Sequence, residues 1–155
     1  MPIADRVKLA ALTFSAAGLV ALAVSEGYTD RTVIPIPGDK PTIGFGTTDG
    51  VKPGDRITPP VALSRALKDV QKFEGALRQC VTVPLHQHEY DAYILFSYNI
   101  GGKAFCSSTL VRVLNAGDYA GACAQISRWD RAGGRVVRGL TIRRAEERAL
   151  CEGKQ

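Results

Sequence analysis

The sequence predicts an α+β protein with a small β-rich lobe and a larger helical lobe. A stretch rich in Gly, Pro, Thr and Asp holds short β-branched pieces at 29–60, and apolar residues recur at helical spacing from there to the end. The length of 155 residues and the 45% hydrophobic content suit one domain. We therefore predict a single domain over 1–155, made of an apolar helix (1–25), a β lobe (26–60) and a helical lobe (61–155).

The first segment carries no charge from Leu9 to Ser25. That run is at the lower limit of what a membrane-spanning helix needs, and Ala, Ser, Thr and Gly dilute it. We expect a helix from Leu9 to about Tyr28, ended near Gly27. From the residues alone three interpretations stay open: a cleaved signal peptide, a weak reversible membrane anchor, or a buried helix of a soluble fold.

The β lobe and the helices that follow it are predicted from local patterns. The pieces "RTVIP" and "PTIGFG" indicate a small hairpin or meander. Ser107 or Ser108 is expected to cap a helix, and the pairs Gly101–Gly102 and Gly133–Gly134 are expected to end two others. The five helices predicted in this part of the chain span 57–81, 84–102, 107–118, 119–134 and 139–153.

The net charge of +5 favours an anionic partner. Seven arginines lie between residues 128 and 148, and they form either a solvated helix face or a patch that faces a substrate. Because the sequence contains no recognisable nucleic-acid-binding module, we do not expect nucleic acid as the partner.

The residues that usually bind metals give no such signal here. His86 and His88 are not spaced as zinc ligands, and the four cysteines form no C-x-x-C motif. The stretch "GFGTTDG" is not a nucleotide-binding loop, so we expect neither a metal nor a cofactor. The cysteine count fits two disulfides in an oxidising compartment or buried free thiols equally well.

Glu26 stands at the end of the apolar run. Glycoside hydrolysis requires a carboxylic acid that keeps its proton near neutral pH, and apolar surroundings favour the protonated form of such an acid. The alternative is an ordinary surface glutamate at a helix end. The residue type and its position therefore make Glu26 a candidate general acid.

Several motifs together resemble one family. "SEG", "PTIGFG", "FSYNIGG", "SSTLVRVLN", "RWDRAGG" and "GLTIRRAEE" occur in the same order in the phage-type lysozymes, the endolysins of glycoside hydrolase family 24. The resemblance covers residues 22–151. It implies a lysozyme-like fold with the active-site cleft between the two lobes. It also implies muramidase activity, which cleaves the β-1,4 bond between N-acetylmuramic acid and N-acetylglucosamine and lyses the host cell.

The resemblance assigns catalytic roles to individual residues. Glu26 matches the general acid, and Thr42 matches the threonine that helps to place the attacking water. The family's aspartate has no counterpart, because Pro35–Ile36 occupies its place and the interval from glutamate to threonine is one residue longer. We favour Asp39 as the substitute, with Asp30 as the runner-up. If neither aspartate serves as the second carboxylate, the alternatives are a lytic transglycosylase that uses mainly Glu26 and a non-catalytic peptidoglycan-binding protein.

The same resemblance implies binding residues and partners. Tyr98, Asn99, Ser108 and Thr109 match positions that face the glycan, although core or capping roles fit them equally well. The expected partner is the peptidoglycan strand, bound by a monomer.

The resemblance also bears on the N-terminal segment and on the cysteines. Some relatives carry a signal-arrest-release helix that tethers the enzyme transiently to the inner membrane and then frees it into the periplasm. Residues 9–24 fit that pattern; otherwise the protein stays cytoplasmic until lysis. The relatives imply the disulfide Cys123–Cys151, which leaves Cys80 to pair with Cys106.

Overall fold

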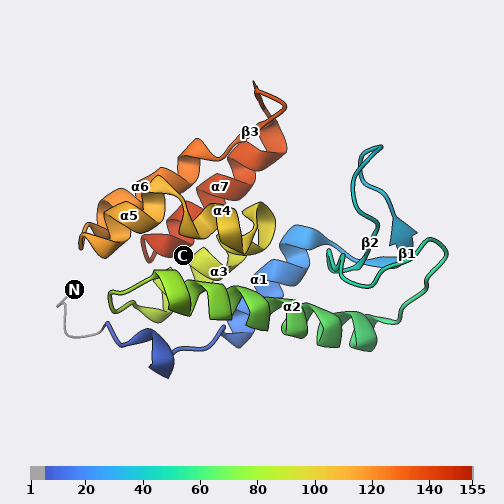
Figure 1. The fold of residues 1–155 in the computed structure, drawn as a ribbon, viewed down its shortest axis with the longest axis horizontal. Coiled ribbons are helices and arrows are strands. Elements are labelled where there is room, and N and C mark those ends of the chain that lie inside the picture. Colours follow the sequence, from blue (N-terminus) through green and yellow to red (C-terminus); the bar gives the residue numbers. More distant parts are fainter. Residues whose placement is uncertain (1–5, 155) are drawn as a thin grey trace. The chain divides into compact units, whose positions relative to one another are not determined.

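A computed structural model describes residues 6–154 of the chain (Figure 1). It confirms the α+β class. The helices are α1 (Ala16–Glu26), α2 (Pro59–Cys80), α3 (Gln87–Ile100), α4 (Gly102–Cys106), α5 (Thr109–Asn115), α6 (Tyr119–Gln125) and α7 (Arg138–Cys151). The strands are β1 (Thr29–Val33), β2 (Thr42–Gly44), β3 (Arg131–Ala132) and β4 (Arg135–Val136), with short 3-10 turns η2 at Leu9–Ala11 and η3 at Ile126–Arg128.

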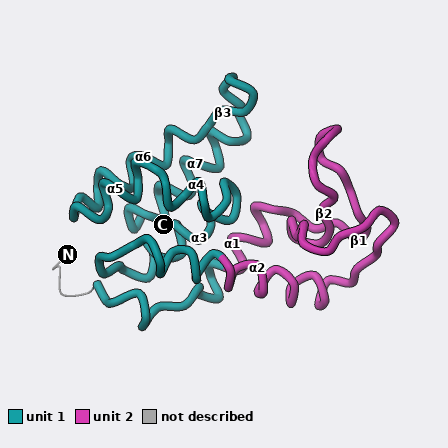
Figure 2. Tube along the Cα trace, in the orientation of Figure 1, with its two compact units in different colours: residues 1–18, 73–155 teal, residues 19–72 magenta. Residues whose placement is uncertain are grey.

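The chain divides into two compact units (Figure 2). The helical unit comprises residues 1–18 and 73–155, and the hairpin unit comprises residues 19–72. The boundaries fall inside α1 and α2, so both helices contribute to both units. The single-domain organisation stays a prediction.

The hairpin unit contains the predicted β meander. Strands β1 and β2 pair antiparallel, with Thr29 opposite Gly44 and Val33 opposite Thr42. The other edge of β1 pairs with residues 55–57 through backbone hydrogen bonds of 3.1 and 2.9 Å. The β-branched pieces that indicated strands therefore do form a small sheet.

A tight loop follows β2, and we call residues 43–47 the glycine loop. Ile43 and Thr47 close it with two backbone hydrogen bonds of 3.0 and 3.1 Å. Gly44 and Gly46 both have positive φ, at 64° and 79°, a conformation that glycine adopts without steric cost. A Cβ atom on Gly44 would lie 2.8 Å from the Cβ of Ala62, so the glycine also lets the loop approach α2 closely.

The helical unit is organised around α3. Its residues 89–97 are all buried, which confirms the prediction of a central helix, and α7 packs against it. The disulfides Cys80–Cys106 and Cys123–Cys151 are both present, as the resemblance implied. The core side chains of this unit include Leu77, Leu85, Tyr93, Phe96, Phe105, Leu110, Leu114 and Ile126.

The N-terminal helix differs from the prediction. Instead of a helix from Leu9 to Tyr28, the chain forms the 3-10 turn η2, a non-helical stretch at 12–15, and α1 from Ala16. Ser15 caps α1, since its Oγ accepts a hydrogen bond of 2.9 Å from the Gly18 N–H. The first residues of the predicted 1–25 helix lie outside the described residues. Within 6–154, no helix combines the length and the apolarity that crossing a membrane requires.

Distant carboxylates explain why the helix does not begin earlier. The Phe14 N–H donates to the Glu74 carboxylate at 2.7 Å, and the Ser15 N–H donates to Asp91 at 3.0 Å. Both carboxylates are buried, with 7% and 5% of their surface exposed. Hydrogen bonds to these acceptors replace the helical hydrogen bonds that the apolar pattern predicts.

The second correction concerns Gly133–Gly134, which does not end a helix. Helix α6 ends at Gln125, and the two glycines form the turn of the antiparallel hairpin β3–β4 with φ of 57° and 77°. Two consecutive positive φ angles are what a two-residue hairpin turn requires. Ser108 does cap α5, and the short α4 was not predicted.

Candidate active site

Glu26 is the last residue of α1 and is half-buried. The helix ends there because Gly27 adopts a φ of 68°, with its N–H still donating to the Ala23 carbonyl at 3.0 Å. The Glu26 carboxylate lies against the glycine loop: a Cβ on Gly46 would be 3.1 Å from Oε2. The candidate acid therefore sits on the end of a helix and faces a loop that has no side chain at that point.

Thr42 is the first residue of β2 and directly precedes the glycine loop. It is half-buried, and its hydroxyl donates to the Val33 carbonyl across the hairpin at 3.4 Å. Glu26 and Thr42 thus belong to the same unit, and both adjoin the glycine loop.

Asp39 lies in the exposed loop between β1 and β2. Its N–H donates to the Ile36 carbonyl at 2.9 Å, which forms a turn. Within residues 6–154 its carboxylate has no hydrogen-bond or ion-pair partner. Asp39 is therefore accessible to a substrate or to a water molecule.

Asp30 is placed differently, in strand β1. Its carboxylate lies 3.3 Å from Arg31 Nε and 3.8 Å from Arg56 Nη1, in exposed ion pairs. It also lines a cavity of about 400 Å³ together with Arg56, Ile57, Thr58 and Val61. Pairing with two arginines fits a carboxylate that braces the meander.

Two of the predicted substrate-binding residues lie near the end of α3, in the helical unit. Tyr98 is half-buried with its ring centroid 5.2 Å from that of Phe73. Asn99 is exposed, and its Oδ1 accepts a hydrogen bond of 2.9 Å from Arg144. Asn99 is thus held in one orientation while it remains accessible.

The other two lie at the start of α5. The Ser108 hydroxyl accepts from the Val111 N–H at 3.3 Å and donates to the Phe105 carbonyl at 2.6 Å. These bonds give Ser108 a capping role, which was one of the two roles considered for it. Thr109 is exposed at the first position of the helix.

The sequence pattern does not distinguish Arg144 from the neighbouring arginines, yet it is the largest fully buried side chain in the described structure. Its Nε lies 2.7 Å from Glu147 Oε2, and its guanidinium lies 5.1 Å from the centroid of the Phe96 ring. Burial raises the pKa of Glu147, and the charges of Arg144 and Arg143 oppose that rise. At least one arginine of the late cluster therefore belongs to the core.

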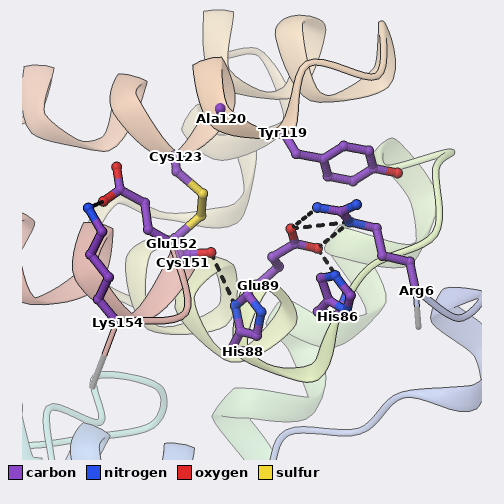
Figure 3. A pocket seen from close by; sticks show the side chains of 10 residues that line it. All are labelled: Arg6, His86, His88, Glu89, Tyr119, Ala120, Cys123, Cys151, Glu152 and Lys154. Atoms are coloured by element: carbon purple, nitrogen blue, oxygen red, sulfur yellow. Dashed lines mark hydrogen bonds and ion pairs between the residues drawn. A yellow bond between two sulfur atoms is a disulfide. The ribbon is translucent and has the colours of Figure 1, made fainter. Parts of the chain in front are cut away.

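A second cavity, of about 380 Å³, lies in the helical unit (Figure 3). Arg6 reaches into it, bonds Glu89 at 2.7 Å and lies 3.6 Å from the centroid of the Tyr119 ring. His86 and His88 stack with ring centroids 5.1 Å apart. His86 forms a capping box with Glu89 at the start of α3.

His86 and His88 therefore have structural roles at the start of α3. His88 Nδ1 lies 3.2 and 3.1 Å from the carbonyl oxygens of Leu150 and Cys151, at the end of α7. Across residues 6–154, no group of three or more His, Cys, Asp and Glu side chains is arranged to hold a metal ion.

The fold and the glycine-loop site define a class, the lysozyme-like α+β proteins. The profile of the phage lysozyme family matches residues 23–147, so the chain belongs to the phage lysozyme family. Family membership confirms the expected class of enzyme, a lysozyme.

Individual relatives agree with this assignment. The chain is 37% identical to the SAR-endolysin of Pseudomonas phage phiKMV over 146 residues, which cover 92% of this chain and 88% of that protein. The endolysin of Bacillus phage PZA is also 37% identical over 90% of this chain, but the chain spans only 55% of that protein's length. The muramidase domain of SpmX from Asticaccaulis excentricus superposes with a TM-score of 0.84 at 29% identity, over 90% of this chain and 97% of that one.

Proposed function

We propose that this protein is an endolysin that hydrolyses the β-1,4 bond between N-acetylmuramic acid and N-acetylglucosamine in peptidoglycan and so lyses the host cell. The observation that carries the proposal is the placement of Glu26. It is a half-buried carboxylate on a helix end, directly against the glycine loop that Thr42 precedes. Membership of the phage lysozyme family supports the same activity.

In the proposed reaction Glu26 donates its proton to the glycosidic oxygen as the bond to the leaving sugar breaks. Asp39 accepts a proton from the attacking water, and the Thr42 hydroxyl helps to orient that water. An inverting mechanism of this kind requires roughly 6.5–9.5 Å between the two carboxyl groups, so that a water molecule fits between them and the sugar.

The glycan is proposed to contact Tyr98, Asn99 and Thr109, with Ser108 holding the start of α5 in place. Their accessibility supports this for Asn99 and Thr109 in particular. The net charge of +5 favours the approach of a monomeric enzyme to an anionic cell wall.

The decisive experiment is the substitution Glu26→Gln, which keeps the size of the side chain and removes its acidic proton. We expect the rate of peptidoglycan cleavage to fall by about 100- to 10,000-fold, because general acid catalysis contributes about 10²–10⁴-fold. Circular dichroism and thermal unfolding should match those of the parent protein. Cleavage at the parental rate would refute the assignment of the acid.

Mass spectrometry of the digested peptidoglycan separates the proposed reaction from its alternatives. Hydrolysis leaves new reducing ends, whereas a lytic transglycosylase leaves 1,6-anhydro ends. Binding without any new ends would identify a non-catalytic peptidoglycan-binding protein. Only new reducing ends support the proposal.

We also propose that the N-terminal segment first exports and tethers the enzyme at the inner membrane and then releases it into the periplasm. Two observations support this: the uncharged run from Leu9 to Ser25, and the name SAR-endolysin of the phiKMV relative. In the described fold residues 9–18 of this segment are docked within the helical unit, with Leu9 and Leu12 buried. That docked arrangement would be the released form.

Ala16→Leu combined with Ala17→Leu tests the release step. Both alanines are exposed in the docked fold, so leucines there should change the stability of the released form little. In the membrane they make the segment more apolar, which favours the tethered state. We expect the variant to stay in the membrane fraction while the parent protein partitions into the soluble periplasm. Identical fractionation of the two proteins would contradict the proposal.

A further inference from the structure

The hydroxyl of Thr47 links the glycine loop to α2. Thr47 is only 2% exposed, and its Oγ1 donates a hydrogen bond of 2.8 Å to Asp69 Oδ2. Asp69 is a residue of α2 with 15% of its side chain exposed, and its other oxygen lies 3.7 Å from Lys72 Nζ. The bond joins a mostly buried donor to a mostly buried acceptor, and few waters can replace either partner.

The same threonine closes the loop through its backbone. Its N–H and carbonyl pair with Ile43, so Thr47 is held by two main-chain bonds as well as by its side chain. Gly46 is the residue directly before it. The position of Gly46 is therefore set by a neighbour that has little freedom to move.

Gly46 in turn supports the candidate acid. An added Cβ there would come within 3.1 Å of Glu26 Oε2 and 3.6 Å of its Cδ, so the carboxylate occupies the space that a side chain would fill. The positive φ of 79° also favours glycine at this position. Any movement of the loop at Gly46 changes the surface on which the Glu26 carboxylate rests.

From this chain of contacts we infer that Thr47 and Asp69 are positioning residues for Glu26, acting through Gly46. The inference rests on the proposed function, in which Glu26 donates a proton to the glycosidic oxygen. A general acid works only within hydrogen-bond distance of that oxygen. A misplacement of about 1 Å can reduce the rate by about 100-fold.

The test is Thr47→Val, which keeps the shape of the side chain and removes its hydroxyl. Thr47→Ser, which keeps the hydroxyl, is the conservative variant, and Thr48→Val is the matched control because Thr48 is exposed in the adjacent position. On a soluble glycan fragment of peptidoglycan, at a temperature where every variant is folded, we expect Thr47→Val to lower kcat by about 10- to 100-fold with little change in KM. Thr47→Ser and Thr48→Val should stay within about twofold of the parent enzyme.

Asp69 provides a second, independent pair of variants. Asp69→Asn retains an oxygen that can accept the Thr47 hydrogen bond, whereas Asp69→Leu does not. We expect the asparagine variant to retain most of the activity and the leucine variant to lose as much as Thr47→Val. The limb of the pH–rate profile that reports the general acid should shift in the two impaired variants and stay in place in the others.

A purely structural role predicts a different result. Thr47→Val would then unfold at a lower temperature, but the folded enzyme would keep its kcat and its pH profile, and the inference would be overturned. Glu26→Gln separates this failure from failure of the proposed function. If Glu26→Gln is inactive while Thr47→Val is fully active, only the positioning role is refuted. If Glu26→Gln is active, the acid itself is wrongly assigned.

Discussion

The buried carboxylates that hold the N-terminal segment in the helical unit differ from the two candidate catalytic carboxylates of the hairpin unit. In the helical unit Glu74, Glu89 and Asp91 are buried, and each accepts hydrogen bonds from residues between 6 and 15. In the hairpin unit Asp39 is exposed and Glu26 is half-buried. Each of the three buried carboxylates already accepts hydrogen bonds from the N-terminal segment, so these carboxylates stabilise its docked position. A carboxylate that must exchange protons with a substrate needs access from solvent, and burial alone is therefore a poor guide to the catalytic acid.

The largest effect on stability is expected for Glu89→Ala. This change removes the partner of Arg6 and also the acceptor of the His86 N–H at 2.8 Å. Breaking a buried ion pair from one side costs about 3–5 kcal/mol, and we expect about 3 kcal/mol because 16% of the Arg6 side chain is exposed. Urea unfolding measures the loss.

A matched control sharpens that prediction. Glu146→Ala removes an exposed glutamate in α7 and should change the free energy of unfolding by less than about 0.5 kcal/mol. For both variants, the cleavage rate per folded molecule should equal that of the parent. A fall in that rate for Glu89→Ala would mean that the buried carboxylates also serve the reaction, and the contrast between the units would fail.

In contrast to Glu89→Ala, Asp39→Asn is expected to lower the cleavage rate and to leave the stability unchanged. Losing the base that activates water should lower kcat by about 100-fold, which corresponds to about 2.7 kcal/mol in the activation free energy. The free energy of unfolding should stay within about 0.5 kcal/mol, because the side chain is exposed. Reducing-end assays and urea unfolding on the same preparation test both halves of the prediction.

Asp30→Asn is the comparison variant for Asp39. Its ion pairs with Arg31 and Arg56 are exposed, and such pairs contribute about 0–1 kcal/mol. We expect small changes in both rate and stability. If Asp30→Asn instead abolishes cleavage and Asp39→Asn does not, the role of second carboxylate passes to Asp30.

Much of this organisation could be predicted because it depends on local sequence. The serine before α5, the glycine after α3 and the β-branched pieces around the "PTIGFG" loop act over a few residues, and the structure follows them. Motif order likewise predicts Glu26 and Thr42 as candidates, and both adjoin the glycine loop. These features involve neighbours in the chain, so a single sequence contains the necessary information.

The rest depends on contacts between distant residues. The stretch before Ala16 has a helical composition, but its N–H groups bind Glu74 and Asp91, which lie 60 and 76 positions away in the chain. Arg144 is one of several arginines in a charged helix, and only packing against Phe96 and Glu147 makes it part of the core. The choice between Asp39 and Asp30 depends on the conformation of the loop between β1 and β2. The interval from Glu26 to Thr42, which includes this loop, is one residue longer than in the family pattern, so the pattern does not predict the conformation of the loop.

The disulfide Cys123–Cys151 determines whether proteolysis of the hairpin β3–β4 separates the chain into fragments. It joins two cysteines 28 positions apart in the sequence, and the segment between them includes the whole exposed hairpin β3–β4. A protease that cuts beside Gly133 would therefore produce two fragments that are still covalently joined. The cut chain would migrate as one species on a non-reducing gel and as two after reduction. Helix α7, which contributes the buried Arg144, would stay attached to the core it packs against.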